Sequence, residues 1–576
     1  MIAGFKIISL GILGCLLISL SGATEGAELN AIAPYIGAVA AKVVKLDTSK
    51  SLTGNQVHLT PENVQKMWGS IPPGDVVIFG PGEYRVELKL LGNKSWSATT
   101  PTIFTAETPR SVIINGSDIV KDWLATGDGR YVRAWPSEPS QVFVDGVPLT
   151  QLGGTVFGGF PVNPNTEYNS LHKDNGGIWP GRVMYSVQMS MPVNSFFYDS
   201  DKHQLYLNML GNPNEKKVEV SIRRRPFYAE KVSGIVLDGL IFRHSNTSIA
   251  GRGAAVAMIG DDNVIQNVVV EDADLAGVQM VGNRNRLLNS IARHNGQLGV
   301  AIRGVDNHIE GVEASYNNTR GFNKWWEAGG FKFVGNGGLI NSEFVRNTAI
   351  GNLGDGIWFD WKNKNNIIRS NVSAYNSGFG IHYEVSRSGV IQDNIIYGNG
   401  QRGIFLPDSA NCWVTHNLVI SNGLEGIAAV YTGRKDNLGV DFGAEDNKIF
   451  SNIIGWNKGL ALIMPKGAKN IGVSDGNIFL DNQKIKMSLG YPSPLSPETS
   501  SLSDWIALSQ LDKNSAASQG AMPKSIADAI ATHQPVKDWA EILKLANLAR
   551  DAKGTYNPQE TLPGGQANVL GPRKLN

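Results

Sequence analysis

Cysteine is almost absent from this sequence. Its 576 residues include two cysteines, Cys15 and Cys412. Cys15 lies in an apolar run near the N-terminus, so removal of that run would leave Cys412 as a lone thiol, which cannot form an intrachain disulfide. The fold must therefore be stabilised by burial and hydrogen bonding rather than by covalent cross-links.

Excess charge of either sign is also missing. The chain has 52 basic and 51 acidic side chains, so it lacks the basic footprint of a nucleic-acid-binding protein, and we expect no nucleic-acid partner. It contains no GxxxxGK[ST], HExxH or CxxC motif, the patterns typical of phosphate loops and of many zinc sites. We therefore expect neither a cofactor nor a bound metal.

Long apolar runs are confined to the N-terminus. Lys6, the apolar stretch 7–20 and the small residues after it are typical of a secretory signal peptide over residues 1–27 rather than of a membrane span. Ile-Leu-Gly-Cys ending at Cys15 leaves a lipoprotein anchor as an alternative, although Cys15 lies inside the apolar run. We expect a secreted or periplasmic protein with no membrane span. The oligomeric state is not indicated.

Glycine, by contrast, is abundant, with 66 residues, and several glycines recur at a nearly constant interval. Gly277, Gly299 and Gly321 are 22 residues apart, and a second series follows at intervals of 24, 23 and 23: Gly356, Gly380, Gly403 and Gly426. Between the glycines lie short runs of β-branched residues in period-2 alternation, broken by asparagine and glycine, which predict short strands. There is no leucine consensus and no helical period.

Asparagines recur in the same register. One series is Asn371, Asn394 and Asn417, and a second is Asn376, Asn399 and Asn422. Amides stacked in successive coils can hydrogen-bond the amides above and below them. The repeat therefore predicts an all-β fold, a right-handed parallel β-helix with about one coil per repeat.

The repeat does not cover the whole chain, and its limits suggest five segments. Beyond the signal peptide we expect an N-terminal cap with the first coils, a β-rich insertion with hairpins, the parallel β-helix that carries the site, and a C-terminal tail, over residues 28–120, 121–230, 231–484 and 485–576. Apolar residues at helical spacing predict a helix over 536–551 in the tail, with Pro535 at its start.

Two consecutive repeats place a carboxylate at the same position. GIWFDW (356–361) carries Asp360 and GIHYEV (380–385) carries Glu384. When the glycines are aligned, period-2 alternation directs both carboxylates outward, on neighbouring rungs about 4.8 Å apart. Two such charges about 5 Å apart repel by about 3 kcal/mol at an effective dielectric near 20.

A purely structural ladder would favour opposite charges or amides at these positions. The pair suits a reaction in which one acid stays ionised while the other keeps a proton near neutral pH. Retaining glycoside hydrolysis uses two carboxyl groups about 5–5.5 Å apart, one as nucleophile and one as proton donor. Asp360 and Glu384 are therefore candidate catalytic residues, and the other interpretation is that both are simply solvated.

The surroundings of the pair fit a carbohydrate substrate. The candidate substrate-binding residues flank the two acids in sequence or lie beside them in the aligned repeats: Trp325, Trp326, Glu327, Lys332, Trp358 and His382. Exposed indoles stack on the apolar faces of sugar rings. The lysine and the histidine could tune the acids electrostatically or bind a hydroxyl group.

These segments resemble the β-helical retaining β-xylosidases of glycoside hydrolase family 120. The resemblance lies in WWEAGGFKF (325–333) and in the GIWFDW and GIHYEV strands, which follow one another on a solenoid with a β insertion. It implies that Asp360 is the nucleophile and Glu384 the acid/base. His382 and Tyr383, before the glutamate, depart from the family pattern.

Two other interpretations remain open. A polysaccharide lyase or uronate epimerase on the same fold could use Lys332, Arg387 or Arg402 as its base, with calcium held by acidic side chains. A non-catalytic carbohydrate-binding solenoid would display the aromatic residues alone.

Overall fold

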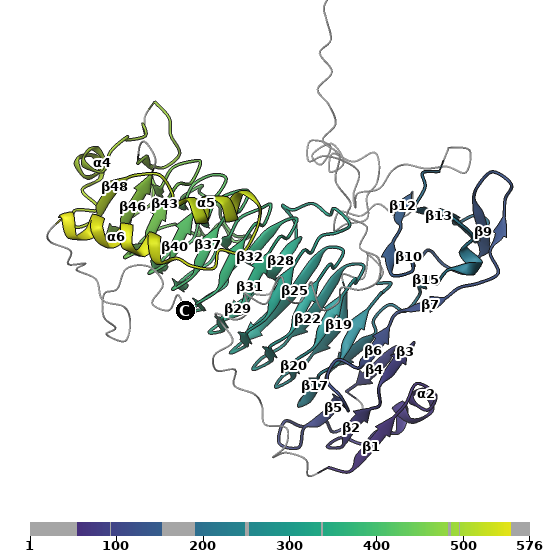
Figure 1. The fold of residues 1–576 in the computed structure, drawn as a ribbon. Coiled ribbons are helices and arrows are strands. Elements are labelled where there is room, and N and C mark those ends of the chain that lie inside the picture. The colour runs from purple at the N-terminus through teal and green to yellow at the C-terminus, as the bar shows by residue number, and fades with distance from the viewer. Residues whose placement is uncertain are drawn as a thin grey trace, which may run out of the picture.

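Three long parallel β-sheets run the length of the protein and form a parallel β-helix. The computed structural model describes residues 54–553 apart from 93, 153–190, 248–252, 336–337, 482–484 and 495. The signal peptide and lipoprotein predictions, and Cys15 with them, lie outside the described residues. Each coil supplies one strand in turn to sheets A, B and C, and consecutive coils pair side by side, so the rungs stack along one axis (Figure 1).

The strands are short, and most contain three or four residues. Sheet A contains, in spatial order, β1 (Gln56–Leu59), β2 (Val76–Phe79), β5 (Thr102–Ala106), β17 (Ile235–Asp238), β20 (Val264–Gln266), β23 (Arg286–Leu288), β26 (His308–Glu310), β30 (Glu343–Val345), β33 (Ile367–Arg369), β36 (Val390–Gln392), β39 (Trp413–Thr415), β42 (Lys448–Phe450) and β45 (Val473–Asp475). Sheet B contains β3 (Gly82–Tyr84), β6 (Val112–Asn115), β18 (Ile241–Arg243), β21 (Val269–Glu271), β24 (Ile291–Arg293), β27 (Glu313–Ser315), β31 (Thr348–Ile350), β34 (Val372–Ala374), β37 (Ile395–Tyr397), β40 (Leu418–Ile420), β43 (Ile453–Gly455), β46 (Ile478–Asp481) and β48 (Ala516–Gln519).

Sheet C carries the two acids. It contains β4 (Leu88–Leu91), β16 (Phe227–Glu230), β19 (Ala254–Ile259), β22 (Ala276–Val281), β25 (Leu298–Val305), β28 (Gly329–Phe333), β32 (Asp355–Asp360), β35 (Ile381–Glu384), β38 (Ile404–Pro407), β41 (Ile427–Val430), β44 (Leu462–Met464) and β47 (Met487–Leu489), while the two-residue β29 (Leu339–Ile340) pairs with the end of β25. Inward-facing aliphatic and aromatic side chains of all three sheets form one continuous core. This burial stabilises the described part of the chain, in which Cys412 is a free cysteine.

Buried asparagines line two of the turns, as the sequence predicts. The backbone N–H and the side-chain Nδ2 of Asn371 both donate to Asn394 Oδ1, and Asn394 donates in the same way to Asn417. A parallel series joins Asn376 to Asn399 and Asn399 to Asn422. Because each amide is buried and satisfied by the next coil, these ladders fix the register of the stack.

One glycine of the first series lies elsewhere. The register pairs Leu298 with Gly329, so Gly330, and not Gly321, follows Gly299 in the stack. The spacing is longer here because the chain leaves the coil. Asn317 bonds its counterpart Asn352, which is 35 residues away in sequence, whereas Asn371 and its counterpart Asn394 are 23 residues apart. The additional residues form a loop before β28 that carries Trp325 and Trp326.

The β-rich segment between β6 and β16 forms two small sheets beside the first coils (Figure 1). Their strands are β7 (Ser117–Ile119), β10 (Val142–Val144), β11 (Val147–Pro148) and β15 (Val218–Ser221) in one sheet, and β8 (Leu124–Ala125), β9 (Tyr131–Ala134), β12 (Thr150–Leu152), β13 (Ser195–Asp199) and β14 (Gln204–Asn208) in the other. The solenoid resumes with β16, which pairs with β4 and β19 although it lies within the range expected for the insertion.

Helices are few and short. At the start of the described chain, α2 (Val64–Met67) and the 3-10 turn η2 (Trp68–Ser70) precede β2, and a second 3-10 turn, η3 (Pro213–Glu215), precedes β15. The tail contains α4 (Leu502–Ser509), α5 (Lys524–Ala531) and α6 (Ala540–Lys553). None of the helices in the described part of the chain has the length and apolarity needed to cross a membrane.

The predicted tail helix is present but begins later than expected. It starts at Ala540 rather than directly after Pro535, because the Asp538 side chain accepts a hydrogen bond from the Ala540 N–H and caps the helix. Ile542, Ala546 and Ala549 are buried in a cluster with sheet B side chains. The helix therefore covers the outer face of sheet B and leaves the acids on sheet C untouched.

The asparagine ladder gives a stability prediction. In Asn417→Ala, both donors of Asn394 lose their acceptor inside the core, and we expect the free energy of unfolding to fall by about 2–4 kcal/mol, since a buried unsatisfied donor costs about 1–3 kcal/mol. The urea midpoint should therefore fall clearly. The control Asn55→Ala removes an exposed amide and should leave the midpoint unchanged. Equal midpoints for the two variants would contradict this role of the ladder.

Candidate active site on sheet C

The two acids lie directly opposite each other on neighbouring rungs. Strands β32 and β35 pair in parallel, with Trp358 opposite His382 and Asp360 opposite Glu384. The alternate residues of both strands, Ile357, Phe359, Ile381 and Tyr383, are fully buried in the core. The side chains between them therefore project from the outer face of sheet C, in the arrangement that alignment of the glycines predicts.

Asp360 is paired with a buried cation. Lys332 of β28, on the preceding rung, donates from Nζ to Asp360 Oδ2 at 2.9 Å. The lysine side chain is only 4% exposed, and its Nζ lies over the Trp358 ring, 2.7 Å from the ring centroid. Burial lowers the pKa of Lys332, while the Asp360 carboxylate acts in the opposite direction. The lysine thus fixes the position of the carboxylate by a charge-assisted hydrogen bond.

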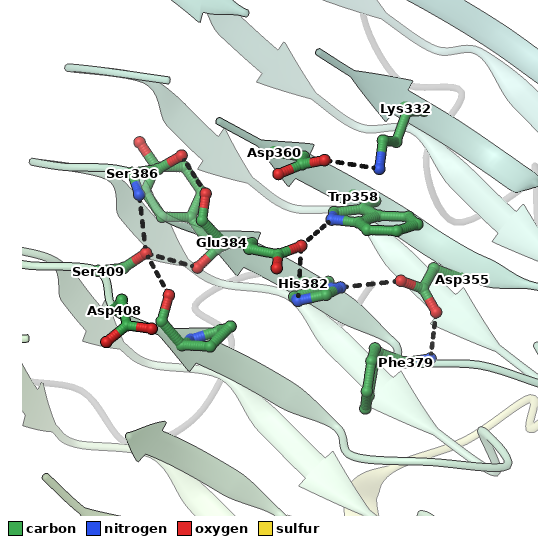
Figure 2. Close-up of polar contacts among 12 residues, drawn as sticks. Lys332, Asp355, Trp358, Asp360, Phe379, His382, Glu384, Ser386, Asp408 and Ser409 are labelled. Carbon is green, nitrogen blue, oxygen red and sulfur yellow. Dashed lines mark hydrogen bonds and ion pairs between the residues drawn. The ribbon is translucent and has the colours of Figure 1, made fainter. Parts of the chain in front are cut away.

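Several side chains contact the Glu384 carboxylate, and Figure 2 shows two of them, Trp358 and His382. Its Oε2 accepts a hydrogen bond from Trp358 Nε1 at 2.9 Å and lies 3.4 Å from His382 Nε2. Its Oε1 accepts one from Arg434 Nη1 at 2.5 Å. Both carboxylate oxygens are therefore engaged.

These neighbours change the expected titration of the pair. Burial raises the pKa of Glu384, but His382, Arg434 and Lys332 together outweigh burial and lower it. The expectation that one acid keeps its proton near neutral pH is therefore wrong for Glu384 in this state. The repulsion between the two acids follows from the repeat, whereas the cations beside Glu384 come from other parts of the chain.

Arg434 contacts Glu384 directly and is not among the site residues that the sequence predicts. It lies in the segment 431–447, which connects β41 to β42 outside the regular repeat. Its Nε donates to Asp408 Oδ2 at 2.8 Å, and Asp408 is fully buried and also accepts hydrogen bonds from the backbone N–H groups of Thr432 and Gly433. Asp408 thus clamps the base of the segment and directs Arg434 onto Glu384.

A signal for this segment is present in the sequence. Asn422 bonds its counterpart Asn457 across 35 residues instead of 23, so an extra loop is evident at this coil. Two further contacts hold the loop over the site: Lys362 donates to Asp436 at 3.1 Å, and the rings of Trp361 and Phe442 lie 5.1 Å apart. The spacing does not reveal which loop residue reaches the acids.

The predicted aromatic residues take different positions. Trp325 is 42% exposed and lies 5.8 Å from the Phe379 ring. Trp326 instead packs against a small apolar cluster that includes Phe322. Trp358 is buried between Lys332 and the His382 ring, which stacks on it at 4.9 Å. Trp325 is therefore the most accessible of the three indoles for contact with a ligand.

The three charged residues predicted to bind substrate differ in how closely they contact the two acids. His382 is buried, and its Nδ1 lies 2.9 Å from Asp355 Oδ2. Glu327 is half-buried and acts electrostatically on Lys332. Lys332 and His382 thus contact the acids and are not free to bind solvent-exposed hydroxyl groups, whereas Glu327 lies at the margin of the site.

The two arginines that a lyase or epimerase could use are paired with other acids. Arg387 contacts Glu445 at 3.4 Å, and Arg402 pairs with Glu425 at 2.7 Å. Lys332, the third candidate base, is occupied by Asp360. Within the described ranges, no group of three or more histidine, cysteine or acidic side chains is arranged to hold a metal ion.

Comparison with known proteins identifies the fold. A family model described as a right-handed β-helix region matches residues 254–419 and 338–449, so the solenoid is a right-handed parallel β-helix. No curated protein sequence matches the chain.

Solved structures with the same fold are only distantly related in sequence. A structure of XylC with xylose matches 74% of this chain and 83% of its own, at 14% identity and a TM-score of 0.53. A structure described as a glycoside hydrolase matches 75% and 94%, at 10% identity and a TM-score of 0.42. The PL6 polysaccharide lyase Pedsa3628 from Pseudopedobacter saltans matches 84% and 96%, at 12% identity and a TM-score of 0.41. At these identities the likeness concerns the fold alone.

The cations around Glu384 give a prediction that requires no substrate. In Arg434→Gln, the pKa of Glu384 should rise, because a positive charge and a charge-assisted hydrogen bond to the ionised form are removed. The measurement is a carboxyl titration by NMR with ¹³C-labelled glutamate, assigned through Glu384→Gln.

Lys362→Gln provides the matched control, since it removes a cation that contacts the same loop through Asp436 and not through Glu384. It should leave the Glu384 titration close to that of the wild type. A rise of the same size in both variants would show that Arg434 does not act through its direct contact.

Proposed function

We propose that the protein is a glycoside hydrolase that cleaves its substrate with retention of anomeric configuration. The observation that carries the proposal is the placement of Asp360 and Glu384 on directly paired rungs of sheet C. Adjacent rungs bring two carboxyl groups to about the 5–5.5 Å that a retaining mechanism needs, whereas an inverting mechanism needs a wider gap for a water molecule.

Asp360 acts as the nucleophile in this mechanism. Its carboxylate attacks the anomeric carbon, and the bond from that carbon to the departing oxygen breaks, which leaves a glycosyl ester on Asp360. The ion pair with buried Lys332 holds the carboxylate in a single orientation. The lysine also lies against Trp358, so it keeps its position when Asp360 loses its negative charge on forming the ester.

Glu384 acts as the acid and then as the base. It donates a proton to the departing oxygen in the first step and accepts one from the attacking water in the second, which releases the sugar and restores Asp360. Arg434 is bonded to Glu384 in the free enzyme, so substrate entry has to move the guanidinium before Glu384 can carry a proton. Arg434 retains Asp408 as a partner when it moves.

The surface beside the two acids fits a saccharide substrate. Trp325 is exposed next to Phe379, and an exposed indole offers a flat apolar face to a pyranose ring. The likeness to a structure of XylC with xylose makes β-xylosides the first sugars to test. If residues 1–27 act as a signal peptide, the substrate comes from plant or microbial polysaccharides outside the cell.

Variants of the two acids test the proposal. On a panel of nitrophenyl glycosides that includes β-D-xyloside, Asp360→Ala and Glu384→Ala should each lower kcat/KM on the active substrate by about 10³-fold or more, because each removes a group that acts in the transition state. The control Glu343→Ala removes an acid from sheet A and should retain full activity.

Azide then distinguishes the roles of the two acids. With Asp360→Ala it should give a glycosyl azide of inverted configuration, and with Glu384→Ala one of retained configuration, both identified by NMR. Turnover that survives in both variants would refute the assignment. Unsaturated products absorbing in the ultraviolet would instead indicate a lyase.

A further inference from the structure

A buried aspartate and histidine stand behind Glu384. His382 precedes Glu384 by two residues on β35, and Asp355 lies on the neighbouring strand β32. Asp355 Oδ2 is 2.9 Å from His382 Nδ1, and its Oδ1 accepts a hydrogen bond from the Phe379 N–H at 2.9 Å. The two side chains are almost fully buried, so water does not screen this contact.

Aromatic rings fix the orientation of the imidazole. It is stacked between Trp358 at 4.9 Å and Phe405 at 5.1 Å, with Phe379 at its edge at 4.7 Å. The ring cannot turn over between these neighbours without disrupting them. Nδ1 therefore faces Asp355, and Nε2 faces Glu384 Oε2 at 3.4 Å without making a hydrogen bond to it (Figure 2).

The proton on Nε2 follows from the groups that face it. Nδ1 carries a proton and donates a hydrogen bond to Asp355, because a carboxylate accepts hydrogen bonds and does not donate them. If Nε2 carried only its lone pair, it would lie against an ionised carboxylate that already accepts from Trp358 and Arg434. Two acceptors would then face each other in a buried site, an arrangement that proteins avoid. A proton on Nε2 turns this repulsion into an ion pair.

We propose that His382, held by Asp355, stores the proton that Glu384 delivers to the departing oxygen. This inference rests on the proposed function. In the free enzyme the proton resides on Nε2 while Arg434 bonds Glu384. When substrate displaces Arg434, the proton passes from Nε2 to Oε2, and Glu384 then donates it to the departing oxygen as the glycosidic bond breaks. In the second step Glu384 takes a proton from the attacking water and returns it to Nε2, so no proton is gained or lost.

The other charged groups around the ring are consistent with this cycle. Lys332 lies across Trp358 and is neutralised by Asp360, while Arg402 lies beyond Phe405 and is paired with Glu425. Arg434 is shared between Glu384 and Asp408. Among the described residues, Asp355 and Glu384 are thus the two acids that contact the ring directly, and His382 is a positioning residue that acts through Glu384.

The first test measures the proton itself. In the full-length protein labelled with ¹⁵N-histidine, the His382 signals are assigned by their loss in His382→Phe. Both ring nitrogens should carry protons at a pH at which Glu384 is ionised, and Asp355→Asn should reduce this population. An unprotonated Nε2 at that pH would overturn the proposal, and this readout requires no substrate.

The second test separates proton supply from structural support. His382→Phe keeps a ring between Trp358 and Phe405 but carries no proton. On aryl glycosides of the sugar that the panel identifies, kcat/KM should fall about 10²–10⁴-fold for a phenyl leaving group, which needs a proton. For a dinitrophenyl leaving group, which leaves as an anion, it should stay within a fewfold of the wild type.

Equal losses on the two substrates, or no loss on either, would overturn the proposal. The control His308→Phe removes an imidazole that contacts Glu310 and Glu343 on sheet A and should leave both rates unchanged. If no glycoside is turned over, or if the Asp360 and Glu384 variants remain active, the proposed function fails. The ¹⁵N experiment still decides the protonation of His382 in that case.

Discussion

Hydrogen bonding between successive coils forces equivalent residues of the repeat to stack on neighbouring rungs, about 4.8 Å apart. Every outward position on sheet C therefore belongs to a column, and a residue placed at a given point in one repeat lies against its equivalent in the next. The buried asparagine ladders hold this register, because a slip by one residue would leave a row of amides without partners inside the core. The distance between Asp360 and Glu384 is a direct consequence of this constraint.

The same stacking determines how the acids are charged. Two carboxylates on adjacent rungs repel each other, and the protein offsets that repulsion with cations from two different parts of the chain. Lys332 comes from the preceding rung and Arg434 from a loop fifty residues farther along the chain than Glu384, while His382 lies on the same strand as Glu384. The result is a network in which each acid has its own cation, and in which the proposed acid/base is held ionised until its surroundings change.

Two loops that interrupt the repeat add side chains to the site that the regular rungs do not provide. A regular solenoid presents a flat ladder of side chains, whereas this one lengthens a coil before β28 and again after β41. The first addition places Trp325 beside Phe379, and the second brings Arg434 onto Glu384. The rigid rungs fix the reacting groups, and the loops provide the groups that contact or release a ligand, a division of labour common to sites built on stable scaffolds.

The sequence by itself determined the fold, because glycine spacing, period-2 alternation and recurring asparagines are local patterns that only a parallel solenoid satisfies together. It also determined the adjacency of Asp360 and Glu384, since a fixed repeat converts sequence distance into position on a rung. The partners of the two acids, and with them the direction in which the pKa of Glu384 shifts, depend on the tertiary structure. Arg434 lies in a stretch without periodicity, so its contact with Glu384 could not be obtained by counting residues, and Gly321 lies outside the stack because the chain leaves the coil there. Side chains from neighbouring coils bury Lys332 and His382 and hold Asp355 against the imidazole. Such packing depends on the three-dimensional arrangement of the coils, and the spacing of the repeat does not specify it.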